Sequence, residues 1–157
     1  MKNKINSIYI IILIFSIDLF SKNWIINHLK IHEKKIISSI LNIFYVKNYG
    51  AAFNMLSNQG GWQIWFLSFV SIISILIIIK IVVNTKNEYK NQIIPYTLII
   101  SGAIGNLSDR IFRGFVIDFI DLHIKNFHFP TFNIADFSIF IGAIVIGIRH
   151  YFFTNFD

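Results

Sequence analysis

The sequence predicts an all-α membrane protein with four transmembrane helices and a single domain covering residues 1–157. The first observation is composition: 55% of the 157 residues are hydrophobic and only 14% are charged. A soluble domain carries about 25% charged residues, so this composition disfavours an ordinary soluble enzyme. The second observation is that four apolar stretches are each long enough to cross a bilayer. A helix of about 20 residues, rising 1.5 Å per residue, spans roughly 30 Å of hydrocarbon.

The four predicted helices follow one another along the chain. The first is preceded by Lys2 and Lys4, as in a signal peptide, but no small-residue cleavage site follows, so we expect a retained helix. Four spans place both termini on one side. Lysines are nearly balanced between the two sides, and the pair before the first helix favours cytoplasmic termini. The predicted spans are about 7–28, 62–83, 92–111 and 133–153.

Two connections carry structure of their own. The segment 29–61 contains strand-like stretches at 36–40 and 43–46, which predict a small extramembrane β element lying on the bilayer. The segment 112–132 is aromatic and amphipathic, and we expect it at the membrane interface.

The acidic residues are the main functional signal. Ionisable groups at membrane depth are costly and tend to mark function. Five of the eight acids lie in or beside the predicted spans, near ends that share one membrane face, which predicts a catalytic site near the outer face of the membrane. These acids are Asp18, Asp109, Asp118, Asp121 and Asp136.

Asp118 and Asp136 are the candidate catalytic pair. Both lie in apolar surroundings, and two carboxyl groups brought close together share a proton and titrate as a pair. One can then activate a water while the other, protonated, supports a substrate carbonyl, as in aspartic proteases. Simpler roles remain open at this point. Asp136 could be an acid favoured by a helix N-terminus, and Asp118 could pair with Arg110 or Arg113.

Other polar positions also have two interpretations. Asp18 and Lys22 are spaced i, i+4 and could simply neutralise each other, or Lys22 could contact phosphate or a carbonyl. Asp109 and Arg110 are interpreted as a structural charge pair that ties the third predicted helix to its neighbours. Asn48, before a turn, could shape that turn or bind substrate backbone.

Several chemistries are excluded or disfavoured. The chain has no cysteine, so thiolate catalysis and cysteine-bound metals are impossible. Its five histidines lack zinc-protease spacing, and no metal or other cofactor is expected. Nucleic acid is not an expected partner, since membrane lipid explains the basic loops. Two alternatives remain open, namely a transporter or channel subunit that relays protons through its acids and a non-catalytic assembly subunit.

Four motifs in order resemble those of the type II signal peptidases, also called lipoprotein signal peptidases. They are Asp18-x-x-x-Lys22; Asn48-Tyr49-Gly50-Ala51-Ala52-Phe53; Gly105-Asn106-Leu107-Ser108-Asp109-Arg110 with Gly114-x-Val116-x-Asp118-Phe119; and Phe132-Asn133-x-Ala135-Asp136. The resemblance covers nearly the whole chain.

The resemblance implies a four-helix membrane bundle with a β-cradle and an interfacial amphipathic helix in the bacterial inner membrane. It implies an aspartic endopeptidase that cleaves diacylglyceryl-modified prolipoproteins before the lipidated cysteine and is inhibited by globomycin-type cyclic peptides. Asp118 and Asp136 fall on the catalytic positions. Residues implied to bind substrate or support the site are Asp18, Lys22, Asn48, Gly50, Asn106, Asp109, Arg110 and Asn133.

Overall fold

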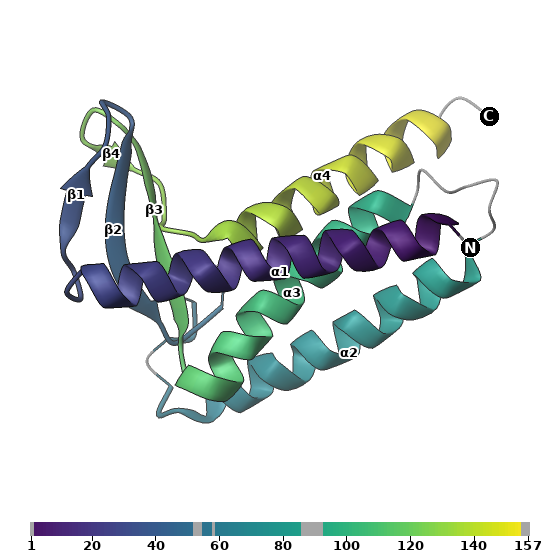
Figure 1. Ribbon diagram of the computed structural model, residues 1–157, viewed down its shortest axis with the longest axis horizontal. Coiled ribbons are helices and arrows are strands. Elements are labelled where there is room, and N and C mark those ends of the chain that lie inside the picture. Colours follow the sequence, from purple (N-terminus) through teal and green to yellow (C-terminus); the bar gives the residue numbers. More distant parts are fainter. Residues whose placement is uncertain (1, 52–54, 58, 86–92, 155–157) are drawn as a thin grey trace.

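Four helices and one small antiparallel sheet make up the computed structural model, which describes residues 2–51, 55–57, 59–85 and 93–154 (Figure 1). Ala52, Phe53 and Asn54, at the end of the second motif, lie outside the described residues. The helices are α1 (Lys2–His28), α2 (Trp62–Asn84), α3 (Ile93–Arg113) and α4 (Ile134–Thr154). These bounds match the four predicted helical stretches closely, since long apolar runs admit little else.

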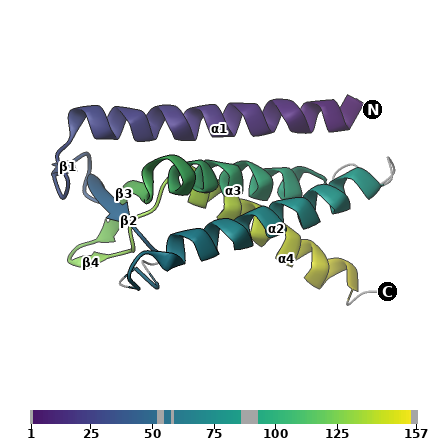
Figure 2. The same cartoon turned by 90° about the horizontal axis from the view of Figure 1, so that it is seen from below.

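Three of the four helices are long and apolar enough to cross a membrane: α1, α2 and α4. Their outward faces carry large exposed apolar side chains such as Leu13, Trp65 and Phe140, as expected of surfaces that face lipid. Helix α3 is less apolar because its last three turns carry polar residues, of which Asn106 and Asp109 are buried inside the bundle. Helix α3 lies against each of the other three helices (Figure 2).

Small residues allow α3 and α4 to pack closely. A Cβ atom on Gly102 would lie 2.2 Å from the Ala135 carbonyl oxygen, and one on Gly142 would lie 2.6 Å from the Pro95 carbonyl oxygen. Glycines at such contacts let helix backbones approach each other in membrane bundles. The start of α4 is therefore fixed beside the second half of α3.

The sheet lies at one end of the bundle, and both chain termini point toward the other end (Figure 1). Its strands are β1 (Lys34–Ile36), β2 (Leu41–Asn48), β3 (Val116–Ile124) and β4 (Phe127–His128), in that order and all antiparallel. The 112–132 connection thus forms the last two strands. The predicted strand at 36–40 is wrong beyond Ile36, because the chain turns there and Ile37 and Ser38 both donate to the Leu41 carbonyl.

A buried cluster fastens the sheet to α1. Ile25 and Leu29 of α1 pack with Tyr45 of β2 and with Ile117 and Phe119 of β3. This contact holds the first half of β3 against the end of α1, next to the first turn of α4.

Candidate active site

Asp118 lies in β3, where the sheet meets the helices, and only 3% of its surface is exposed. Its Oδ1 accepts a hydrogen bond from Asn133 Nδ2 at 2.7 Å, and its Oδ2 accepts one from Asn48 Nδ2 at 3.0 Å. The alternative in which Asp118 pairs with Arg110 or Arg113 is wrong for the described residues. Arg110 Nη2 instead donates to the Gly50 carbonyl at 3.1 Å, and Arg113 contacts Asp109.

Asp136 lies in the first turn of α4 and forms a reciprocal cap with Asn133. The Asp136 backbone N–H donates to Asn133 Oδ1 at 2.8 Å, while the Asn133 backbone N–H donates to Asp136 Oδ2 at 3.3 Å. This is the pattern of a capping box, with aspartate in place of the usual glutamate. The other oxygen, Oδ1, accepts a hydrogen bond from Asn106 Nδ2 at 2.7 Å. Asp136 is therefore an acid at a helix N-terminus, as one of the two interpretations predicted. It also accepts a hydrogen bond from Asn106 of α3.

Asn133 links the two acids. Its amide nitrogen donates to Asp118, and its amide oxygen accepts from the Asp136 backbone. Burial, followed by the nearby charge of Asp136, raises the pKa of the Asp118 carboxyl to about 7. A pair of this kind can hold one proton between two carboxyl groups at neutral pH, which is the state that acid–base catalysis on a carbonyl requires.

A buried lysine lies on the far side of Asn106. Lys22 is fully buried, and its Nζ contacts Asp18 Oδ2 at 2.7 Å, Asp109 Oδ2 at 3.0 Å and Asn106 Oδ1 at 3.1 Å. Asp18 Oδ1 also accepts the backbone N–H of Ala135 at 2.9 Å. Mutual neutralisation of Asp18 and Lys22 is confirmed, and the pair also joins α1 to α3 and α4.

Asp109 and Arg110 tie α3 to neighbouring parts of the structure, as predicted, but through Lys22 and the Gly50 carbonyl and not through each other. Asp109 pairs with Lys22 and with Arg113, which is four residues further along α3. Neighbouring positions on a helix point about 100° apart, whereas positions i and i+4 share a face. The i, i+4 spacing is the signal that would have identified Arg113.

Asn48 and Gly50 form a tight turn that closes on the site. The Gly50 backbone N–H donates to Asn48 Oδ1 at 2.8 Å, which leaves the Asn48 amide nitrogen directed at Asp118. A Cβ on Gly50 would lie 2.0 Å from the Met55 carbonyl oxygen, so this position requires glycine. The expected turn is confirmed, and the same asparagine also contacts an acid.

All ten predicted site residues belong to one contiguous network of hydrogen bonds and ion pairs. Asp121, the fifth acid near the spans, lies outside the described contacts of that network. Its carboxylate accepts from Asn42 Nδ2 at 2.9 Å and His128 Nδ1 at 2.7 Å, and Lys34 Nζ lies 4.0 Å away. This acid lines a hollow on the sheet whose other members are Lys34, Phe44, His128, Phe129 and Thr131.

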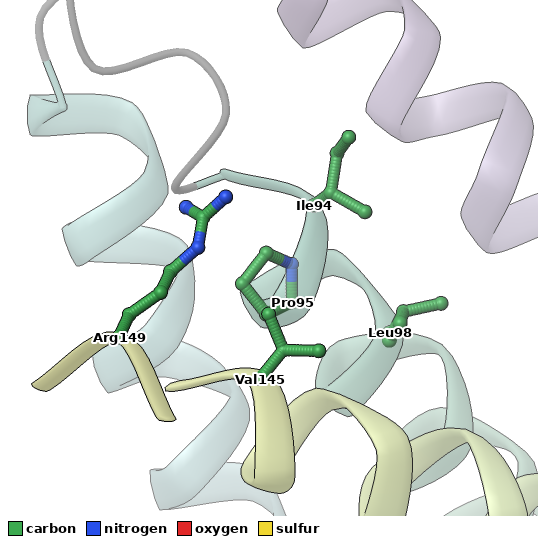
Figure 3. A pocket seen from close by; sticks show the side chains of 5 residues that line it. All are labelled: Ile94, Pro95, Leu98, Val145 and Arg149. Atoms are coloured by element: carbon green, nitrogen blue, oxygen red, sulfur yellow. The ribbon is translucent and has the colours of Figure 1, made fainter. Parts of the chain in front are cut away.

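A second shallow pocket lies at the opposite end of the bundle, between the start of α3 and the last turns of α4 (Figure 3). Its lining is apolar except for Arg149. The residues that line it are Ile94, Pro95, Leu98, Val145 and Arg149. None of the ten site residues belongs to this pocket.

The fold and the network together define an integral membrane protein whose buried polar core is organised around two carboxyl groups. Residues 10–152 match the family model described as signal peptidase (SPase) II. Relatives named lipoprotein signal peptidase include one from Buchnera aphidicola subsp. Schizaphis graminum, 58% identical over 97% of this chain and 99% of its own. Another, from Serratia proteamaculans, is 37% identical over 90% of this chain and 84% of its own.

Solved structures agree with the sequence relatives. A bacterial membrane enzyme determined by the in meso method at 2.3 Å resolution superposes with a TM-score of 0.83 at 29% identity, covering 97% of this chain and 93% of that one. A second such enzyme, at 1.9 Å, gives a TM-score of 0.80 at 32% identity, covering 97% and 94%. The chain belongs to the signal peptidase II family, and it is a membrane-bound protease of lipoprotein processing.

Proposed function

We propose that the protein is an aspartic endopeptidase that removes signal peptides from diacylglyceryl-modified prolipoproteins, cleaving before the lipidated cysteine. The observation that carries this proposal is the pair Asp118 and Asp136, two acids from different elements joined through Asn133. Such a pair can activate water without a metal or other cofactor. The relatives' name, lipoprotein signal peptidase, supports a lipoprotein substrate, and the resemblance of the four motifs implies its lipid modification.

The chemistry needs one carboxylate and one carboxylic acid. The carboxylate takes a proton from a water, whose oxygen attacks the scissile carbonyl. The carboxylic acid donates its proton to the developing oxyanion. The carboxyl that took the water proton then donates it to the amide nitrogen, while the other carboxylate takes a proton from a hydroxyl of the tetrahedral intermediate. The C–N bond breaks, and the products are the carboxyl end of the signal peptide and the free amino group of the lipidated cysteine.

The same proposal includes a membrane arrangement. All four helices span the bacterial inner membrane as a single domain, with both termini cytoplasmic and the sheet and the acids near the outer face. Asp118 lies at the sheet end of the bundle and the termini lie at the other end, which supports this arrangement (Figure 1). The substrate, anchored by its acyl chains, then reaches the acids laterally from the outer leaflet. The sheet, whose last two strands come from the 112–132 segment, lies at the interface. Globomycin-type cyclic peptides inhibit by occupying the acids.

A proton relay across the membrane has less support. Such a relay needs ionisable groups along the whole path, yet the inner halves of α2 and α4, at 72–79 and 142–148, contain none. The acids of the network instead lie toward the sheet end of the bundle. This one-sided arrangement suits a hydrolytic site at one membrane face.

The test is cleavage of a purified, diacylglyceryl-modified prolipoprotein by the protein in lipid nanodiscs, with both products identified by mass spectrometry. We expect a product that begins at the lipidated cysteine, formed equally well with a chelator present. Asp118→Asn and Asp136→Asn should each abolish it. Undiminished cleavage by either variant, or a requirement for added zinc, would contradict the proposal.

A further inference from the structure

We infer that Lys22 is a positioning residue that, through the Asn106 amide, makes Asp136 the carboxylate that activates water and leaves Asp118 as the proton donor. The inference rests on the proposed function and assigns each acid of the pair its role. It starts from the geometry around Lys22. In the described structure Lys22 contacts neither Asp118 nor Asp136 directly.

All three hydrogens of the Lys22 ammonium group are committed. Its Nζ contacts one oxygen each of Asp18, Asp109 and Asn106 at 2.7, 3.0 and 3.1 Å. An ammonium group donates hydrogen bonds and never accepts them. The Asn106 side chain must therefore turn its oxygen toward Lys22, and its nitrogen the other way.

A second contact fixes the same orientation of Asn106. Asn133 Nδ2 also donates to Asn106 Oδ1, at 3.2 Å. A flipped Asn106 amide would place its NH₂ against two donors, Lys22 and Asn133, and its oxygen against the Asp136 carboxylate. Because all three contacts would then be repulsive, the Asn106 nitrogen stays directed at Asp136 Oδ1, 2.7 Å away.

The two acids therefore lie in different electrostatic environments. Asp136 receives the Asn106 amide and the Asn133 backbone N–H, and it lies at the positive end of the α4 dipole. These features favour a carboxylate. The relative exposure of Asp136 is also higher than that of Asp118, as expected of a group that must meet water.

Asp118 has only neutral partners within hydrogen-bond distance. Asn133 and Asn48 donate to it, and it lies in a strand, which has no comparable dipole. Its pKa near 7, set by burial and then by the charge of Asp136, means that the acid keeps its proton in much of the population at neutral pH. The other charged groups packed around the pair are Asp18 of α1 and Asp109 and Arg113 of α3.

The test separates positioning from simple charge neutralisation. Lys22, Asp18, Asp109 and Arg113 carry two positive and two negative charges. The double variant Lys22→Met with Asp18→Asn removes one of each, so the buried cluster stays neutral while the contact to Asn106 is lost. Asp18→Asn alone is the matched reference, and thermal unfolding reports whether each variant is folded.

For the double variant we expect kcat to fall at least about tenfold relative to Asp18→Asn, with little change in KM. We also expect the acidic limb of the pH–rate profile to move upward by about one pH unit, because the carboxylate has lost its fixed donor. A folded double variant with the kcat and pH profile of Asp18→Asn would overturn the inference, since Lys22 would then only neutralise Asp18.

A second variant keeps the inference testable if the double variant does not fold. Asn106→Ala retains the ion pairs of Lys22 and removes only the amide between Lys22 and Asp136. The same upward shift of the acidic limb is expected, and an unchanged profile would overturn the inference. Asp118→Asn and Asp136→Asn, assayed alongside, test the proposed function separately. If either of these remained fully active, the peptidase mechanism itself would be wrong, whatever Lys22 does.

Discussion

Asp118 and Asp121 lie three residues apart in the same strand, and both are almost fully buried, with 3% and 2% of their surfaces exposed. Their partners differ. Asp118 has two neutral amides and a second acid nearby, whereas Asp121 has one amide, His128 and Lys34. Successive residues of a strand face opposite sides, so positions three apart point to different faces of the sheet.

The two carboxyl groups accordingly titrate in opposite directions. Burial and Asp136 raise the pKa of Asp118 to about 7. Burial would also raise the pKa of Asp121, but the Asn42 and His128 hydrogen bonds and the charges of His128 and Lys34 outweigh it and lower that pKa below its ordinary value. The comparison shows that burial alone does not make an acid reactive. An acid is available for proton transfer when its neighbours leave its charge uncompensated.

The largest expected contrast is in activity. Asp118→Asn should reduce kcat by about 1,000-fold, because an amide cannot supply the exchangeable proton. Asp121→Asn should stay within about threefold of wild type, since its carboxylate neutralises a cluster outside the network. Steady-state cleavage of a lipidated prolipoprotein measures both. A loss of similar size in the two variants would break the comparison.

The next effect comes from the helix that carries Asp136. Gly102→Ala would place a Cβ 2.2 Å from the Ala135 backbone oxygen, so α4 must shift, at a cost of about 1–3 kcal/mol in the free energy of unfolding. Cleavage should fall with it, because Asp136 moves with Ala135. Gly147→Ala is the matched control, since a Cβ there meets nothing within 4 Å. Thermal unfolding in detergent should show a lower midpoint for the first variant only.

An effect of similar size is expected on stability at Asp121. Asp121→Asn should cost about 1–3 kcal/mol at neutral pH, because donors once paired with a carboxylate lose that charge. A lowered pKa means that Asp121 stabilises the fold above the unfolded pKa, near 3.8, and that this contribution is lost as the pH falls through the folded pKa. The difference in melting temperature from wild type should therefore shrink at acidic pH. A gap independent of pH would contradict this assignment.

The last expected effect, on the pH dependence of stability, has the opposite sign. Because the pKa of Asp118 is raised, the folded protein binds more protons than the unfolded chain between about pH 4 and pH 7, and Asp118 lowers stability as the pH rises through that window. Relative to wild type, Asp118→Asn should thus gain a few degrees in melting temperature between pH 4 and pH 8. Parallel melting curves for the two proteins would argue against an uncompensated acid.

Much of the fold follows from the sequence. The helix bounds are predictable to within a few residues at most ends, because apolar runs of this length have few alternatives. The strand at 36–40 failed because Ser38 and Ser39 form a turn that an alternation of apolar residues does not reveal. Helix α3 is less apolar than the other three helices because it carries polar residues, and some of these, such as Asn106 and Asp109, are buried inside the bundle.

The sequence predicted which residues form the candidate site but not most of the contacts between them. Motif order identified the two acids and their supporting residues. The contacts of Asn133 with both acids, and of Lys22 with three partners, depend on how α1, α3, α4 and β3 meet, which no local pattern encodes. Local i, i+4 spacing indicates only the Asp18–Lys22 and Asp109–Arg113 contacts among the ion pairs of the network.

The most direct test of a coupled pair is a ¹³C NMR titration of the Asp118 carboxyl in wild type and in Asp136→Asn, with the signal assigned by its absence from Asp118→Asn. In wild type the midpoint should lie near pH 7. In Asp136→Asn it should fall, because the neighbouring charge is gone, yet stay above 3.8, because burial remains. A wild-type midpoint near 3.8, or one that Asp136→Asn leaves unchanged, would contradict the account.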